Sequence, residues 1–335
     1  MKNRLALCLV GAALCAAGPA FAGDGTNLIK MIPAESQIVL VFDVADARDS
    51  ALLQKGYDSL LAAKPDAKAK LTEIGLDPMK DIDTVLFAGS PKGDEFDDMQ
   101  NMVIIVEGRI PKDKLATVPG VKASKYAGTT IWSKGDTDVA VLGDRLFFTK
   151  VGKMKAALDL AVGKGKAKAL SAATSPKGKK LRDALAATDT TTDLWMTVLI
   201  PDKAKADMKA QGMSADVVSV GVNFTADIAT AMRIVTDSDA TAGKIVTMAQ
   251  GQLAQISQAA GSMGLAKAAK SLMISQDKAK VNISLTLTEA ELNSLMNLAG
   301  LATGAGGSKP PSTAPARSTP GSLAPPTTGT KPRTP

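Results

Sequence analysis

The chain contains no histidine, and its two cysteines, Cys8 and Cys15, both lie within the first 22 residues. The rest of the chain has no thiol with which to form a disulfide, so its fold must be held by a hydrophobic core and by hydrogen bonds. Beyond residue 22 the chain therefore lacks both imidazole, the commonest general base, and thiolate, a common nucleophile. These two groups are also the commonest zinc ligands. A Ser-His-Asp triad is excluded. Function must therefore depend on carboxylates, hydroxyls, amines and surface shape.

The first 22 residues have the three parts of an export signal. Lys2 and Arg4 precede an uncharged apolar stretch, and Ala20 and Ala22 place small side chains just before Gly23. This pattern predicts a signal peptide at 1–22, cleaved after Ala22, and export to the periplasm or the extracellular space. The apolar run is too short to cross a bilayer comfortably, so we expect no transmembrane span in the mature chain.

Charge is balanced over the body of the chain. Of the 40 basic residues, two lie in the signal and four lie beyond residue 301, which leaves 34 basic and 33 acidic residues in 23–301. A nucleic-acid binder needs a clustered basic surface, so this balance predicts no nucleic-acid partner. The local exception is a lysine-rich stretch within 164–180. We interpret it as a solvated linker, with a contact to anionic lipid or glycan as the alternative.

Methionine is plentiful and aromatic residues are few. Scarce aromatic side chains disfavour sugar-binding and single-strand-binding surfaces, which use stacking platforms. Many of the methionines lie in the second half: Met196, Met208, Met213, Met232, Met248, Met263, Met273 and Met296. Methionine fills irregular cores and also lines adaptable binding surfaces. Because these residues lie in apolar periodic segments, we expect them to fill the core.

The hydrophobic pattern divides the body near residue 165 into halves with a similar order of elements. Strands are predicted at 38–42, 84–88, 102–106, 130–133, 139–142, 146–149, 194–200, 217–223, 229–236, 272–275 and 281–287. Helices are predicted at 45–62, before Gly75, and at 112–116, 152–162, 202–211, 240–263 and from the capping box Thr288-Glu-Ala-Glu291 onward.

Hairpins dominate this order, which predicts the α+β class with mainly antiparallel sheet and helices packed on one face. We expect two related α+β subdomains, at 23–165 and 166–301, that form an internal repeat. The two subdomains either have separate sheets or share one. A single curved sheet with helices on its concave side is the alternative. Residues 302–335 hold eight of the 17 prolines. They predict a disordered Pro/Ser/Thr-rich tail, whose positive charges offer a contact to anionic envelope components.

Two acidic clusters are the candidate cation sites. Asp94, Glu95, Asp97 and Asp98 are weak calcium candidates, but they lack EF-hand spacing, and we interpret them as a solvated hairpin loop.

The second cluster, Asp77, Asp81 and Asp83, follows Gly75 and includes an Asp-Pro step, so turn chemistry is favoured over metal binding. We assign no catalytic, cofactor-binding or metal residue and expect no cofactor. The chain has no Walker A loop, dinucleotide fingerprint or nucleophile elbow.

Three segments resemble exported, periplasmic bacterial proteins of unknown function. They are Met31-Ile-Pro-Ala-Glu-Ser-Gln-Ile-Val-Leu-Val-Phe-Asp43, Gly75-Leu-Asp-Pro-Met-Lys-Asp-Ile-Asp83 and Val281-Asn-Ile-Ser-Leu-Thr-Leu-Thr-Glu289. The resemblance spans 30–300 and implies a Gram-negative envelope setting, with no catalytic residue carried over.

These observations favour a non-enzymatic exported envelope protein that acts through a protein-binding surface. One alternative is a periplasmic carrier of a lipid or other hydrophobic ligand, which predicts an apolar cavity between sheet and helices. A protein-binding module instead predicts an exposed apolar surface. The other alternative, a hydrolase that works with carboxylates alone, predicts a buried acid with a shifted pKa in a cleft.

Overall fold

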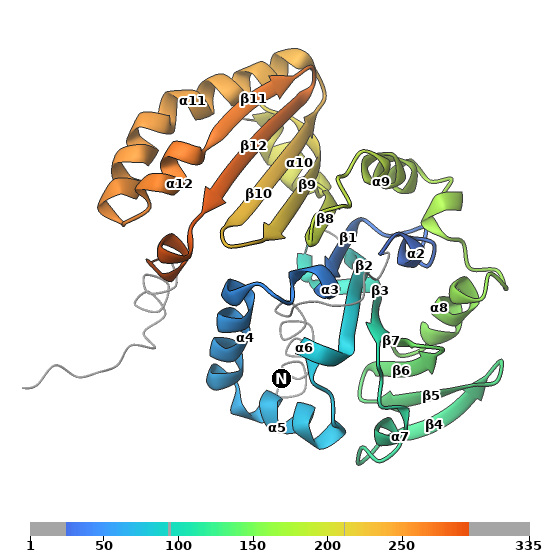
Figure 1. The fold of residues 1–335 in the computed structure, drawn as a ribbon. Helices are drawn as coiled ribbons and strands as arrows, with labels where there is room; N and C mark the ends of the chain where they lie inside the picture. Colours follow the sequence, from blue (N-terminus) through green and yellow to red (C-terminus); the bar gives the residue numbers. More distant parts are fainter. Residues whose placement is uncertain (1–24, 93–94, 211, 295–335) are drawn as a thin grey trace, which may run out of the picture. The chain divides into compact units, whose positions relative to one another are not determined.

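One antiparallel sheet of 12 strands runs through the described part of the chain (Figure 1). The structure, a computed structural model, describes residues 25–92, 95–210 and 212–294. In sheet order the strands are β11 (Met273–Asp277), β12 (Lys280–Leu287), β10 (Ile228–Thr236), β9 (Ala215–Phe224), β8 (Leu194–Leu199), β1 (Ile38–Asp43), β2 (Ile82–Lys92), β3 (Glu95–Gly108), β7 (Arg145–Lys150), β6 (Thr137–Leu142), β5 (Thr129–Lys134) and β4 (Lys122–Tyr126). The predicted signal with Ala20, Ala22 and Gly23, and the predicted tail, lie outside the described residues.

The two halves of the chain share this sheet through β1. One edge of β1 pairs with β2 and the other with β8, so Leu40 lies opposite both Phe87 and Met196. The boundary expected at residue 165 falls in a loop, and the division into two subdomains stays a prediction.

The helices begin and end where local signals place them. They are α2 (Gly25–Ile29), α3 (Val44–Ala47), α4 (Ala51–Ala63), α5 (Pro65–Ile74), α6 (Pro78–Asp81), α7 (Lys112–Leu115), α8 (Met154–Ala161), the 3-10 turn η1 (Leu170–Ala172), α9 (Pro176–Ala186), α10 (Asp202–Ala210), α11 (Asp239–Ser262) and α12 (Ala266–Ser271). Ser50, Ser175 and Ser238 each cap a helix by accepting a backbone N–H with the hydroxyl oxygen. Gly75 ends α5 in the left-handed conformation expected of it.

One face of the sheet carries the larger core. Val39 and Val41 of β1 point to this face and are fully buried. They belong to one cluster with Leu28 of α2, Leu158 of α8 and Leu181 of α9. These three helices therefore cover the same face of the central strands.

The opposite face carries a second core. Phe42 of β1 and Ile104 of β3 pack there with Leu53 and Tyr57 of α4. The α+β class with antiparallel sheet is confirmed. Helices cover both faces rather than the single face expected, because strands such as β1 are continuous apolar runs that must be buried on both sides.

The outer strands β10, β12 and β11 have a smaller core. Only Ala242, Val246 and Val281 are buried in their cluster among the described residues, where they join α11 to β12. Ile274 and Ile283 flank them and are half-buried. Ala260, Leu265 and Ala268 add buried side chains where α11 meets α12, but this end of the sheet still has fewer buried apolar residues than the centre.

The structure corrects the expectation that 164–180 is a solvated linker. Ser175 and Pro176 begin α9, an N-cap followed by proline at the first helical position, and Leu181 of this helix is fully buried. The six lysines of this stretch obscure its short apolar pattern. The predicted helix at 45–62 is also divided, because Ser50 caps a new helix after α3.

The capping box at the end of the body is confirmed. The Thr288 N–H donates to Glu291 Oε2 over 3.1 Å, and the Glu291 N–H donates to Thr288 Oγ1 over 3.4 Å. Residues 289–294 are helical. No helix in the described ranges combines the length and hydropathy that a membrane crossing needs.

Candidate functional site

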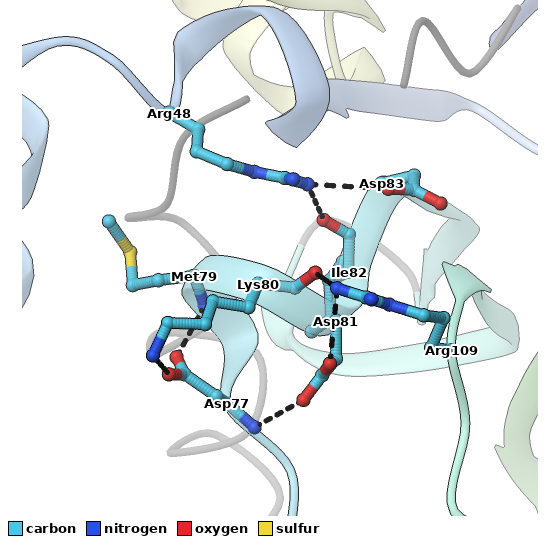
Figure 2. A network of polar contacts seen from close by, with 8 residues as sticks. All are labelled: Arg48, Asp77, Met79, Lys80, Asp81, Ile82, Asp83 and Arg109. Atoms are coloured by element: carbon cyan, nitrogen blue, oxygen red, sulfur yellow. Dashed lines mark hydrogen bonds and ion pairs between the residues drawn. The ribbon is translucent and has the colours of Figure 1, made fainter. Parts of the chain in front are cut away.

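The acidic turn around α6 is a closed network of protein contacts (Figure 2). Asp77 caps α6 by accepting the Met79 N–H over 3.0 Å, and its own N–H donates to Asp81 Oδ2 over 2.8 Å. Lys80 pairs with Asp77 over 2.7 Å. The interpretation of this segment as turn chemistry is confirmed, because its carboxylates bind backbone amides and nearby cations.

Two arginines that the sequence did not single out complete this network (Figure 2). Arg48, at the end of α3, donates to the Ile82 carbonyl over 3.1 Å and pairs with Asp83 over 3.3 Å. Arg109 pairs with Asp81 over 3.5 Å and also donates to the Lys80 carbonyl. Burial raises the pKa of Asp83, and the Arg48 and Arg109 charges oppose that rise. The network thus holds the start of β2 against the end of α3.

The calcium candidates lie on a strand rather than in the loop expected for them. Glu95, Asp97 and Asp98 belong to β3, which extends to Glu95 opposite Lys92 of β2. Asp94 and the side-chain positions of the other three lie outside the described residues. The weak calcium hypothesis therefore stays a prediction.

A carboxylate with a raised pKa lies where β1 meets β8. Burial raises the pKa of Asp43 to about 6, and the charges of Asp46 and Asp193 add to that rise. Asp43 Oδ1 accepts the Asp46 N–H over 3.2 Å, and the Asp43 N–H donates to the Asp193 carbonyl over 2.6 Å. Burial also raises the pKa of Asp193, whose Oδ2 accepts the Phe224 N–H over 2.5 Å. These acids join strand ends and line neither of the two hollows described next.

The first hollow, of about 500 Å³, lies between α2, the start of β7 and the loop after α8. Charged and glycine residues line much of it, including Lys30, Arg145, Asp159, Lys164 and Gly165.

The second hollow, of about 260 Å³, lies on the outer strands. Ser219, Arg233, Asn282, Ser284 and Met273 are among its lining residues. Strand register places these positions on the face opposite to Val281 and Ile283, which α11 covers.

A hydroxyl cluster and a fixed guanidinium lie beside the second hollow. Thr188, Thr197 and Ser219 hydrogen-bond to one another, with Oγ1 of Thr188 and Oγ1 of Thr197 2.7 Å apart. Arg233 donates to Asn282 Oδ1 over 3.3 Å and to the Ala187 carbonyl. These contacts hold polar side chains in place on an open sheet face.

The expectation that the second-half methionines fill the core is wrong. Of those within the described residues, none is buried, and Met248, Met263 and Met273 are 49%, 43% and 67% exposed. Their apolar periodicity follows from half-buried elements with one open side. Met273 begins β11, so the most exposed of the three lies at an edge of the sheet.

The two edge strands of the described sheet differ in charge. β4 carries Lys122 and Lys125, and lysine on an edge strand opposes pairing with another chain. β11 has the sequence MISQD without a lysine. Gln250 of α11 donates to the Ile274 carbonyl over a long 3.5 Å. We call β11, with Met273, the β11 edge.

Comparison with known proteins assigns no family. No family model matches the chain, and no curated protein matches it. Among solved structures, crystal form I of TP0453 is similar at 12% sequence identity and a TM-score of 0.47, covering 81% of this chain and 96% of that one. Crystal form IV of TP0453 gives 12% identity and a TM-score of 0.44, over 82% and 99%. Similarity at this level assigns no function to the chain.

Proposed function

We propose that the chain is an exported, non-enzymatic envelope protein that binds a partner polypeptide at the β11 edge. The observation that carries this proposal is Met273, which is 67% exposed at the start of an edge strand without a lysine. An edge strand offers backbone N–H and C=O groups that only another polypeptide can pair along its length. Methionine suits such a surface because its flexible thioether adapts to different side chains.

The position of the second hollow also supports the β11 edge as the binding site. Met273 and Ser275 line this hollow and also belong to β11. A strand added to β11 would place alternate side chains on the face of the sheet that carries this hollow, next to Met273 and Ser275. Main-chain pairing would supply affinity and the hollow would supply selectivity.

The alternatives have weaker support. A lipid carrier predicts an apolar cavity between sheet and helices, whereas the first hollow is lined largely by charged and glycine residues and the second, more apolar hollow lies on an open face of the sheet. A carboxylate hydrolase predicts its shifted acid in a cleft, whereas Asp43 lies at a strand junction and caps α3.

Photo-crosslinking in the producing cells tests the partner. A crosslinking amino acid at Met273 is expected to capture a discrete polypeptide, and the same group at Ala123 of β4 is the matched control. The purified partner should then bind the wild-type protein, and Met273→Lys should weaken that binding. Capture of lipid alone, or equal capture at both edges, would reject the β11 edge as the site.

Export has its own test. The intact mass of the protein from the envelope fraction should correspond to a chain that begins at Gly23. A mass that retains Met1 to Ala22, or recovery of the protein from the cytoplasm alone, would reject the proposed setting.

A further inference from the structure

The lysine-rich loop after α8 is fixed to the body of the protein. The Ala34 N–H donates to the Lys168 carbonyl over 2.9 Å, and the Leu170 N–H donates to the Ile32 carbonyl over 2.7 Å. The Lys164 N–H donates to the Asp159 carbonyl over 2.8 Å. Backbone bonds at both ends therefore hold this loop next to α2.

Gly165 sets how closely the loop approaches α8. Its φ is +82°, a left-handed conformation, and a Cβ added there would lie 2.2 Å from Asp159 Oδ2. Asp159 Oδ1 meanwhile accepts the Tyr126 hydroxyl over 2.9 Å. The single carboxylate in the lining of the first hollow is thus held within the fold, between the loop and Tyr126.

Positive charge dominates the lining of the first hollow. Lys30, Lys164 and Arg145 contribute cations, and Asp159 contributes the carboxylate. Glu107 compensates Arg145, whose Nε and Nη2 donate to Glu107 Oε1 over 3.0 and 2.9 Å. In the described residues no acid pairs with Lys30 or Lys164, and Lys30 makes a long 3.5 Å contact to Asn27 Oδ1. Both lysines are exposed.

We propose that this hollow binds a phosphate group through Lys30 and Lys164. The two ammonium groups, which pair with no acid in the described residues, outnumber the single Asp159 carboxylate in the lining and so favour an anion such as a phosphate ester, which lysine binds as a point charge. The fixed loop reduces the ordering cost of binding. A volume of about 500 Å³ admits more than a bare ion, so a phosphorylated small molecule and a phospholipid headgroup both fit.

The test uses the full exported chain and two probes. Glycerol 3-phosphate represents the free ligand, and phosphatidylcholine vesicles with and without phosphatidylglycerol represent the headgroup. Amide chemical shifts of Gly163 and Gly165 report binding at this site. Combining Lys30→Ala with Lys164→Ala should weaken binding about tenfold. The matched control combines Lys68→Ala with Lys114→Ala, two exposed lysines of α5 and α7.

Each outcome decides the proposal. Saturable binding of glycerol 3-phosphate that only the Lys30 and Lys164 variant loses supports a free phosphate ester. The same pattern with phosphatidylglycerol vesicles alone supports a headgroup. Equal loss in both double variants would reveal nonspecific attraction and overturn the proposal. No response to either probe, or binding of an acidic peptide instead, would also overturn it.

Discussion

The centre of the sheet and its β11 end are built differently. At the centre, β1 to β3 are buried on both faces, with fully buried Val39, Leu86 and Ile105 on one side and Phe42 on the other. At the β11 end, Ala242, Val246 and Val281 form the buried cluster, and Met273 is exposed. We infer that the centre maintains the fold while the outer strands are open to a partner, because apolar burial dominates stability.

A matched pair of isoleucine substitutions should separate the two regions most strongly. Ile105→Ala should cost about 4 kcal/mol of unfolding free energy, because Ile105 is fully buried in the larger core. Ile283→Ala on β12 should cost about 1.5 kcal/mol, because Ile283 is half-buried. Urea unfolding followed by circular dichroism measures both. Equal costs would contradict the difference between the regions.

The Glu291 carboxylate should be the strongest single polar contact of the outer region. It accepts the Ala268 N–H over 2.7 Å and the Thr288 hydroxyl over 2.8 Å. Glu291→Ala should lower the unfolding free energy by about 2 kcal/mol, because the capping box at Thr288 and the first turn of α12 both lose their hydrogen-bond acceptor. Glu289→Ala, which removes an exposed ion pair with Lys55, should cost less than about 0.5 kcal/mol.

The same carboxylate predicts a pH dependence. Burial alone would raise the pKa of Glu291, but the bonds from Ala268 and Thr288 hold it below its ordinary value. Its stabilisation is therefore present above the unfolded pKa and is lost as the pH falls through the folded one. As the pH falls through the folded pKa of Glu291, the difference in unfolding free energy between the wild type and Glu291→Ala should shrink. A constant difference between them would exclude an ionised Glu291 as the acceptor.

Asp43 should change the stability of the protein with pH in the direction opposite to Glu291. Its folded pKa of about 6 lies above the unfolded value, so its stabilising effect is present at low pH and is lost as the pH rises through 6. Asp43→Asn keeps an oxygen that caps α3 and should raise the unfolding free energy at pH 7 by only about 1 kcal/mol, because solvent screens part of the charge of the half-exposed carboxylate. At pH 4 the gain should vanish. The control is Asp207→Asn, at an exposed position of α10.

Met273→Lys should have the smallest effect on folding. Met273 is 67% exposed, so the change in unfolding free energy should stay below about 0.5 kcal/mol. Its effect should appear in binding, because a lysine on the β11 edge opposes strand addition. A large loss of stability would show that Met273 packs within the protein and does not serve a partner.

The sequence predicts most elements of this fold. The continuous run Val103-Ile-Ile-Val106, Gly75 and the box at Thr288 all indicate structures that are observed. Prediction fails where local signals are mixed. The lysines of 176–186 obscure the pattern of a helix that packs on the core through its buried Leu181. The edge strand β4 is too polar to show an alternating apolar pattern.

The candidate sites depend on contacts between distant segments. Asp77 and Asp81 are recognisable as a turn, but Arg109, the ion-pair partner of Asp81, comes from beyond β3. The hollow around Lys164 needs Lys30 from α2. Methionine exposure likewise depends on tertiary packing, since a half-buried helix and a buried one share the same period.

Native-state hydrogen exchange, resolved by residue, tests the contrast between the two regions most directly. We expect amides of β10 and β12 to exchange through a local opening whose free energy lies several kcal/mol below that of β1 to β3. A partner bound at the β11 edge should then slow exchange in the outer strands and leave the centre unchanged. Equal opening free energies across the sheet would contradict the account, because the outer strands would then be as firmly held as the core.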